Sequence, residues 1–226
     1  MKSKAPIIIA IDGPSASGKG TVARKLAAYF DFAYLDTGLL YRAVGMSVIR
    51  ASGDPTDPEA AERAALKLDP ARTANLGDDV ALRSDQASVA ASKVAAIPEV
   101  RTALLKFQKD FCVHPPQNKS GAVVDGRDIG TVIAPDATVK VFVTASAEAR
   151  AVRRFKELQN RGETTSYELV LADMKSRDAR DAERTIAPTK PAPDAVLLDT
   201  TTLNAEQAFA EAIKIVENTL KDAGLL

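Results

Sequence analysis

The chain has 226 residues, a length that suits one α/β domain with insertions or at most two domains. Thirty Lys and Arg residues balance thirty Asp and Glu residues, so the net charge gives no general attraction to nucleic acid or to an anionic membrane. Trp is absent and aromatic residues make up 5% of the chain, which disfavours a protein that stacks single-stranded bases. We therefore expect no nucleic-acid partner.

Cysteine content and hydropathy set further limits on the class of protein. Cys112 is the only cysteine in the sequence, so the chain cannot form an internal disulfide, which is typical of a reducing compartment. No apolar run reaches the length of a secretory signal or a membrane-spanning helix. We expect a cytoplasmic protein without a membrane partner.

Short apolar runs alternate with helical patterns along the chain. The runs are continuous or rich in β-branched residues, as in strands that are buried on both faces of a sheet. They lie at 7–11, 32–35, 122–124, 139–143 and 195–198. Apolar stripes of helical period follow the first two runs and the last one, and another lies within 98–111. A further helix is predicted from 165 to about 184. This alternation predicts a three-layer α/β fold with a five-stranded parallel sheet.

Several helix starts are marked by their first residues. Thr37 has the side chain of an N-cap, and Pro98 suits the first turn of a helix because its missing N–H is not needed there. Capping-box spacing joins two further pairs, Thr165 with Glu168 and Asn204 with Gln207.

Two segments interrupt the strand pattern. Residues 54–111 are rich in Ala, Asp and Ser and carry little strand signal, so we expect a helical insertion over the carboxyl edge of the sheet. Residues 147–187 are dense in arginine and have the pattern of two helices joined by a turn at 161–162, which would form a short lid. We predict a single domain over 1–226 that carries both insertions.

The strongest motif is the glycine-rich segment GPSASGKGT, which lies between the first predicted strand and an amphipathic helix. Glycine permits a tight turn with positive φ, and successive N–H groups at a helix N-terminus can surround a phosphate. Lys19 would reach the β- and γ-phosphates of ATP. The alternative is a glycine-rich turn without a ligand. The predicted ATP-binding residues are Gly13, Pro14, Ser15, Ala16, Ser17, Gly18, Lys19, Gly20 and Thr21.

Two aspartates, Asp36 and Asp125, each end a predicted strand. In open α/β sheets ligands bind beyond the carboxyl ends of the strands, and a carboxylate there can hold a metal-bound water. We predict Mg²⁺ as the cofactor, held by Thr21 and Asp125 largely through water. The alternative is that these aspartates only cap helices or turns.

Arginine residues supply the expected contacts to the acceptor. A phosphate monoester is already anionic at neutral pH, so it needs charge neutralisation rather than a general base. One helical face carries Asp173, Arg177, Asp181 and Arg184; the alternative role for it is a solvated face with i,i+4 ion pairs. His114 precedes two prolines and is interpreted as a surface residue. The other arginines of the predicted lid are Arg150, Arg153, Arg154, Arg161 and Arg180.

Taken together, the motifs resemble those of the bacterial cytidylate kinase family. The matching segments extend over nearly the whole chain, and the most specific are DGRDIGTVIAPDA at 125–137 and RDARDAERTIAP at 177–188. The resemblance implies a P-loop kinase fold in which 54–111 binds the nucleoside monophosphate and 147–187 forms the lid. It also implies that the γ-phosphoryl group of ATP is transferred to CMP or dCMP.

The resemblance further implies roles for single residues. Arg42 would bind the CMP phosphate, and Ser92, Arg101 and Asp128 would read the cytosine. A guanidinium and a carboxylate complement that base, which offers an amino donor and ring acceptors. The implied catalytic residues are Lys19, Arg127 and Arg184. The implied CMP-binding residues are Thr37, Gly38, Arg42, Ser92, Arg101, Arg127, Asp128, Arg177 and Asp181, the last two at the sugar.

One segment departs from the family pattern. The family's acceptor insertion contains a small β-hairpin, whereas residues 68–81 show little strand alternation, so we expect this hairpin to be shortened. Two alternatives to a cytidylate kinase are a kinase for another nucleoside monophosphate or small metabolite, and a non-catalytic nucleotide-binding module. Because all the expected catalytic arginines lie in one chain, we expect a monomer.

Overall fold

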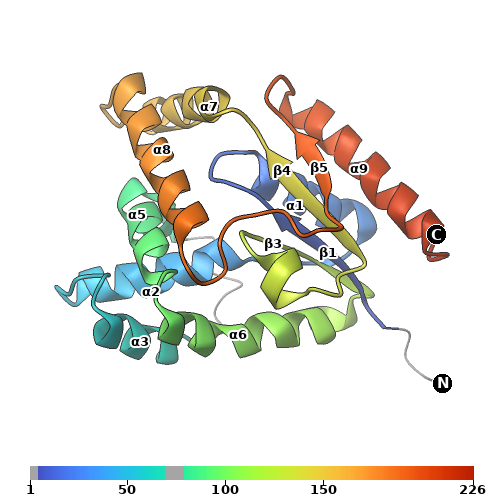
Figure 1. The fold of residues 1–226 in the computed structure, drawn as a ribbon, viewed down its shortest axis with the longest axis horizontal. Helices are drawn as coiled ribbons and strands as arrows, with labels where there is room; N and C mark the ends of the chain where they lie inside the picture. The colour runs from blue at the N-terminus through green and yellow to red at the C-terminus, as the bar shows by residue number, and fades with distance from the viewer. Residues whose placement is uncertain (1–4, 70–78) are drawn as a thin grey trace.

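The computed structural model describes residues 5–69 and 79–226, and a parallel five-stranded sheet forms its centre (Figure 1). The strand order is β2-β3-β1-β4-β5, so the strand that leads into the glycine-rich loop lies in the middle. The strands are β1 (Ile7–Asp12), β2 (Ala33–Asp36), β3 (Gly121–Gly126), β4 (Val139–Thr144) and β5 (Val196–Asp199). The predicted α/β class and the five predicted strands are confirmed, with boundaries that shift by one or two residues.

Helices cover both faces of the sheet, as its apolar strands require. Along β1, Ile9 and Ile11 pack on one side, whereas Ile8 and Ala10 pack on the other, because successive side chains point to opposite faces. The first side is covered by α1 (Lys19–Phe30) and α9 (Ala205–Asp222). The second side is covered by α6 (Pro98–Val113) and by a π-helical turn, η4 (Ile129–Ile133). Three layers result.

Two groups of helices lie beyond the carboxyl ends of the strands (Figure 1). One group contains α2 (Thr37–Arg50), α3 (Pro58–Leu66), the short 3-10 turn η2 (Val80–Arg83) and α5 (Asp85–Val94). It shares an apolar cluster with the first half of α6, while the second half of α6 packs under the sheet. The other group is the pair α7 (Ala147–Asn160) and α8 (Tyr167–Glu183), which pack on each other through Ala151, Leu158, Val170 and Met174. A further 3-10 turn, η3 (Pro116–Asn118), precedes β3.

Helix capping follows the sequence in part. Asn204 and Gln207 form the predicted capping box of α9, and Pro98 lies in the first turn of α6. Two predicted caps are wrong. Ser166, not Thr165, caps α8, because its hydroxyl accepts a hydrogen bond from the N–H of Leu169. Thr37 is the first helical residue of α2 rather than its N-cap, and its hydroxyl donates instead to the carbonyl of Asp125 at 2.8 Å.

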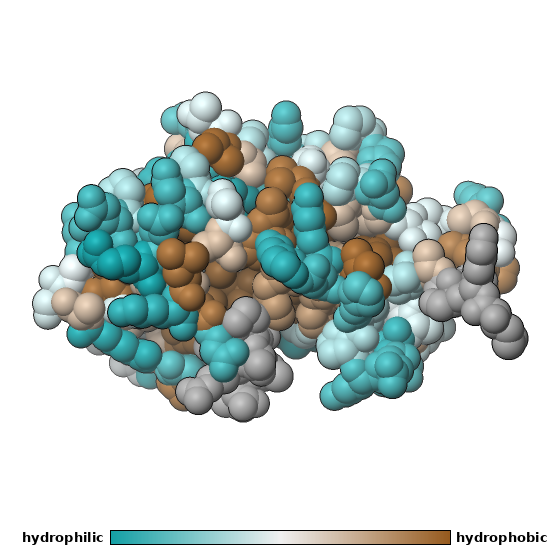
Figure 2. Space-filling model, turned by 90° about the horizontal axis from the view of Figure 1, so that it is seen from below, coloured by the Kyte–Doolittle hydropathy of each residue, from teal (hydrophilic) through white to brown (hydrophobic). Residues whose placement is uncertain are grey.

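The surface is polar with scattered apolar side chains. Figure 2 looks onto the side of the molecule that α3 and α6 form, where hydrophilic and hydrophobic residues are mixed. Leu66 on α3 and Val113 on α6 are among the exposed apolar residues. No helix in 5–69 or 79–226 combines the length and apolarity needed to span a membrane. The predicted shortening of the hairpin at 68–81 falls mostly on 70–78, which lie outside the described residues.

Close packing of α2 on α5 yields a test of this arrangement. A Cβ atom on Gly45 would lie 2.7 Å from the Cβ of Ala90, so Gly45→Ala should cost about 1–3 kcal/mol in unfolding free energy. Helix propensity alone would instead raise stability by about 1 kcal/mol. Urea denaturation decides the sign, with Ser47→Ala on the exposed side of α2 as a control that should not destabilise. A more stable Gly45→Ala protein would contradict the packing.

Candidate active site

A cleft of about 1320 Å³ lies between three parts of the molecule. They are the glycine-rich loop at 13–21 (the phosphate loop), the helices around α2, α5 and α6 (the acceptor side), and the α7–α8 pair. Twelve Lys and Arg residues and seven Asp and Glu residues line it. The chain as a whole has no net charge, so this excess of cations is a local feature. A cleft of this size and charge suits ligands that carry several phosphates.

The glycine-rich loop joins β1 to α1 on one side of this cleft. Gly13 has φ of 147°, and a Cβ there would overlap the carbonyl of Val143; Gly18 has φ of 88°. Only glycine adopts such turns without strain. No side chain caps α1, which leaves the start of the helix open to an anion, although the N–H of Thr21 already donates to the carbonyl of Gly18 at 3.1 Å. The Nζ of Lys19 is 3.4 Å from the carbonyl oxygen of Pro14, within the arc of the loop.

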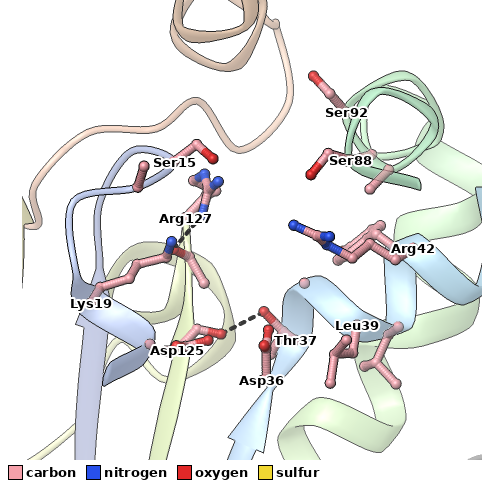
Figure 3. A pocket seen from close by; sticks show the side chains of 18 of the residues that line it. Ser15, Lys19, Asp36, Thr37, Leu39, Arg42, Ser88, Ser92, Asp125 and Arg127 are labelled. Carbon is pink, nitrogen blue, oxygen red and sulfur yellow. Dashed lines mark hydrogen bonds between the residues drawn. The ribbon is translucent and has the colours of Figure 1, made fainter. Parts of the chain in front are cut away.

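Lys19 lies opposite two carboxylates at the ends of β2 and β3 (Figure 3). Burial, reinforced by the nearby Arg127, lowers the pKa of Lys19 to about 7. Burial and the neighbouring carboxylate of Asp36 raise the pKa of Asp125, to which the hydroxyl of Tyr34 donates a hydrogen bond at 3.3 Å. The charged forms of Lys19 and Asp125 are therefore costly to bury in the absence of a ligand that carries several charges of its own.

The same carboxylates are suited to a divalent cation that phosphates hold in part. Within the described ranges, no three His, Cys, Asp or Glu side chains converge as a complete metal cage. Asp36 and Asp125 line the cleft beside Lys19. Hard oxygen ligands of this kind, few in number, fit a metal that is bound mainly by nucleotide oxygens and water. Thr21 is not among the residues that line the cleft.

On the acceptor side, Arg101 and Asp128 form a buried ion pair. The guanidinium of Arg101 also donates to the carbonyl of Ala95 at 3.3 Å and lies over the ring of Tyr41, 5.6 Å from its centroid. Burial raises the pKa of Asp128, against the effect of Arg101. The pair presents a donor and an acceptor side by side at the wall of the cleft.

Asp181 on α8 is the centre of a second cluster. Its carboxylate accepts a hydrogen bond from the hydroxyl of Ser92 at 2.8 Å and from the Nε of Arg127 at 3.4 Å, and it lies 3.9 Å from the Nε of Arg177. Burial alone would raise the pKa of Asp181, but the two guanidinium groups outweigh it and hold the pKa below its usual value. Ser92, predicted to read cytosine with Arg101, also lines the cleft, and without a ligand it contacts the predicted sugar-binding residue.

Several arginines have donor groups without a hydrogen bond. Within the described part of the chain, the buried Nε of Arg177 and Nη2 of Arg184 make none. Burial, together with Arg127, lowers the pKa of Arg177 to about 9. Arg42 points across the cleft toward the phosphate loop (Figure 3), and its Nη1 donates to the carbonyl of Leu82 at 2.7 Å. Unpaired buried guanidinium donors are suited to phosphate oxygens.

The α7–α8 pair contacts both walls of the cleft. Arg150 on α7 donates to the carbonyl of Ser15 at 3.2 Å and forms a bidentate ion pair with Asp178 on α8. Toward the acceptor side, Arg154 pairs with Asp85, and Arg161 donates to the carbonyl of Arg83 at 2.7 Å. The bidentate pair was missed by sequence reasoning, although its two residues belong to segments rich in arginine and aspartate.

Most of the predicted site residues line this one cleft. From the phosphate loop, Ser15, Ala16, Lys19 and Gly20 line it, and every predicted CMP-binding residue does so too. Gly13, Pro14, Ser17, Gly18 and Thr21 do not line it, and of these Gly13 and Ser17 are buried. Ser17 is fully buried, and its carbonyl accepts a hydrogen bond from the hydroxyl of Thr200 at 2.8 Å. His114 makes no part of the lining.

Comparison with known proteins identifies the family. The family model for cytidylate kinase matches residues 9–218. This chain belongs to the cytidylate kinase family. The cytidylate kinases of Paramagnetospirillum magneticum and Rhodospirillum rubrum are each 59% identical to it, over 92% and 93% of this chain and 97% of theirs. The predicted resemblance is confirmed.

A solved structure adds support for the fold alone. An uncharacterized protein from Eubacterium ventriosum has a TM-score of 0.50 with this chain at 16% sequence identity. The likeness covers 93% of this chain and 98% of that one. Both chains therefore share the arrangement of the sheet and its covering helices over nearly their full lengths.

The burial of Lys19 predicts that this residue lowers the stability of the ligand-free protein while it contributes to ATP binding. Lys19→Met should raise the Tm of the ligand-free protein, by roughly 2–4 °C per kcal/mol relieved in a chain of this size, and abolish stabilisation by ATP. The pKa of Lys19 falls from 10.5 unfolded to about 7 folded, so the unfolded chain binds more protons between these values. The advantage of the variant should therefore shrink from pH 7 to pH 10 in calorimetry.

A matched control is Lys175→Met, which removes an exposed lysine on α8. It should show no such dependence on pH. A Lys19→Met protein that is less stable than the wild type at pH 7 would contradict this account of the loop.

Proposed function

We propose that this chain transfers the γ-phosphoryl group of ATP to CMP and dCMP, giving ADP with CDP or dCDP. Membership of the cytidylate kinase family supports this reaction. The observation that carries it in the structure is one cleft that joins a phosphate loop to the Arg101–Asp128 pair. The first suits a triphosphate and the second suits the edge of a pyrimidine.

The acceptor phosphate needs neutralisation rather than deprotonation. The second pKa of a phosphate monoester is about 6, so the nucleophilic oxygen is already anionic at pH 7. Arg42 and Arg184 would bind this phosphate, and Arg127 would contact the transferred group. Guanidinium groups pair with phosphate in bidentate fashion, which both orients the acceptor and cancels charge.

The donor phosphates fit the loop and Lys19, which would stabilise the charge that develops on the transferred group. We propose Mg²⁺ as the metal that accompanies ATP, held by Asp125 and Asp36 through water. When bound, the metal would supply positive charge that offsets the charge of the ATP phosphates. The raised pKa of Asp125 should fall when the cation is present, since an opposite charge favours the carboxylate.

Base recognition follows from the chemistry of the Arg101–Asp128 pair. The amino group of cytosine donates to a carboxylate, and its ring nitrogen and carbonyl accept from a guanidinium. Uracil presents a carbonyl in place of the amino group, so it would face Asp128 with a second acceptor. The lid contacts at Ser15 would exclude water from the transferred group and so limit hydrolysis of ATP.

The supporting residues all come from one chain, which fits the monomer that we also propose. A cytoplasmic location fits the same reaction, since ATP and CMP are found there. Neither proposal is needed for the assignment of the cleft.

Arg127→Ala tests the transition-state role. We expect kcat to fall about 10³-fold or more, because a lost transition-state arginine has that effect in phosphoryl transfer. ADP release in a coupled assay measures the change, and circular dichroism verifies folding. Arg63→Ala, which removes an exposed arginine on α3, is the matched control and should retain full turnover. Near-normal turnover of Arg127→Ala would refute the role.

Asp128→Ala tests base reading with a panel of CMP, dCMP, UMP and AMP. The wild type should prefer CMP and dCMP, and the variant should lose about 1–3 kcal/mol of that preference because the acceptor for the amino group is gone. Preference of the wild type for AMP or UMP would support the kinase of other specificity. ATP binding without ADP release on any of the four would support the nucleotide-binding module.

A further inference from the structure

A buried carboxylate outside the proposed contacts connects the two halves of the cleft. Asp12 is the last residue of β1 and is 5% exposed. Its two oxygens accept hydrogen bonds from the backbone N–H groups of Ile129 and Gly130, each at 2.8 Å. These partners lie more than a hundred positions further along the sequence.

Both N–H groups belong to the start of η4, which directly follows Arg127 and Asp128. The side chain of Asp128 does not cap this turn; it pairs with Arg101 instead. Asp12 therefore supplies the cap from a different strand. Asp12 thus accepts hydrogen bonds from the turn that follows Arg127 and Asp128. Since Gly13 is the next residue in the chain, Asp12 is also covalently joined to the phosphate loop.

The surroundings of the turn leave it little freedom. A Cβ on Gly126 would lie 2.6 Å from the hydroxyl of Thr37, and one on Gly130 would lie 3.2 Å from the Cδ of Lys140. Both ends of the 126–130 segment are thus closely packed. The N–H groups of Ile129 and Gly130 therefore point toward their acceptor, the carboxylate of Asp12. The position of the adjoining Asp128 depends on that acceptor.

The residue type at position 12 is itself informative. Burial raises the pKa of Asp12 to about 6, so a carboxylate is a costly choice here. A hydroxyl or an amide would be easier to bury, but each offers one oxygen, whereas a carboxylate offers an acceptor to both N–H groups at once. A bidentate bond fixes orientation as well as distance.

We propose that Asp12 is a positioning residue that sets the location of Arg127 and Asp128 relative to the phosphate loop, and thereby the affinity for the acceptor nucleotide. Asp12 is not among the residues that line the cleft. The inference rests on the proposed function, because it assumes that Asp128 reads the acceptor base and that the loop holds ATP.

Asp12→Asn provides the test, because it keeps the size of the side chain but replaces one acceptor oxygen with an NH₂ group. That NH₂ group cannot accept the hydrogen bond from the N–H of Ile129 or Gly130. We expect KM for CMP to rise about tenfold or more and kcat to fall, while KM for ATP stays within about twofold. In the ligand-free variant, amide hydrogen exchange at Ile129 or Gly130, followed by NMR, should be faster than in the wild type.

The matched control is Asp199→Asn. Asp199 also ends a strand, β5, and caps the turn after it by accepting from the N–H of Thr201 at 2.8 Å. This control should leave both KM values unchanged. If Asp12→Asn does not fold, Asp12→Glu retains two acceptor oxygens but displaces the turn, and the same selective rise in KM for CMP is expected.

Three outcomes would overturn the proposal. The first is unchanged kinetics together with an unchanged Tm in the Asp12 variants. The second is an equal rise in KM for both substrates. The third is a lowered Tm without any kinetic change, which would make Asp12 a purely structural cap. Failure of the proposed function looks different, because the wild type itself would then not convert CMP.

Discussion

Mutual repulsion between two polyanions is the constraint on which this structure depends. An ATP molecule and a nucleoside monophosphate must come together within one cleft, and water would otherwise screen the groups that join them. The fold meets this requirement by gathering cations at one sheet edge in a chain with no net charge. Lys19 and Arg177 are held there with lowered pKa values because burial and like charges surround them. Lys19 and Arg177 therefore lower the stability of the ligand-free fold, and their charges are available to bind phosphates.

The parallel sheet explains why such distant segments can meet. β1 is central, so the loop after it lies between the ends of β3 and β4, and the acceptor-side residues follow β2 and β3. A single edge thus collects the phosphate loop, Asp36, Asp125 and Arg127. The helices beyond this edge then need only close the cleft, which α7 and α8 do by contacting Ser15 on one side and Asp85 on the other.

Sequence reasoning anticipated the layers and the glycine-rich loop, since apolar runs and glycine spacing are local signals. The acceptor-binding residues that line the cleft were instead predicted from the family resemblance. Sequence reasoning also placed Asp181 and Arg184 on one helical face. It failed where a side chain's partner is far along the chain. The hydroxyl of Thr37 donates to the carbonyl of Asp125 and does not cap its own helix. Nothing in the neighbouring residues marks Asp12 as the cap of a turn near residue 129, because the register that brings them together is tertiary.

The ion pair between Arg101 and Asp128 has a consequence for discrimination. Each partner already satisfies the other before any nucleobase enters, so an incoming ring has to replace both halves of that bond together. A ring that matches only the guanidinium would leave the buried carboxylate without this partner, and one that matches only the carboxylate would leave the buried guanidinium without its own. In the proposed reaction, wrong bases would then be rejected because they replace only one half of this ion pair.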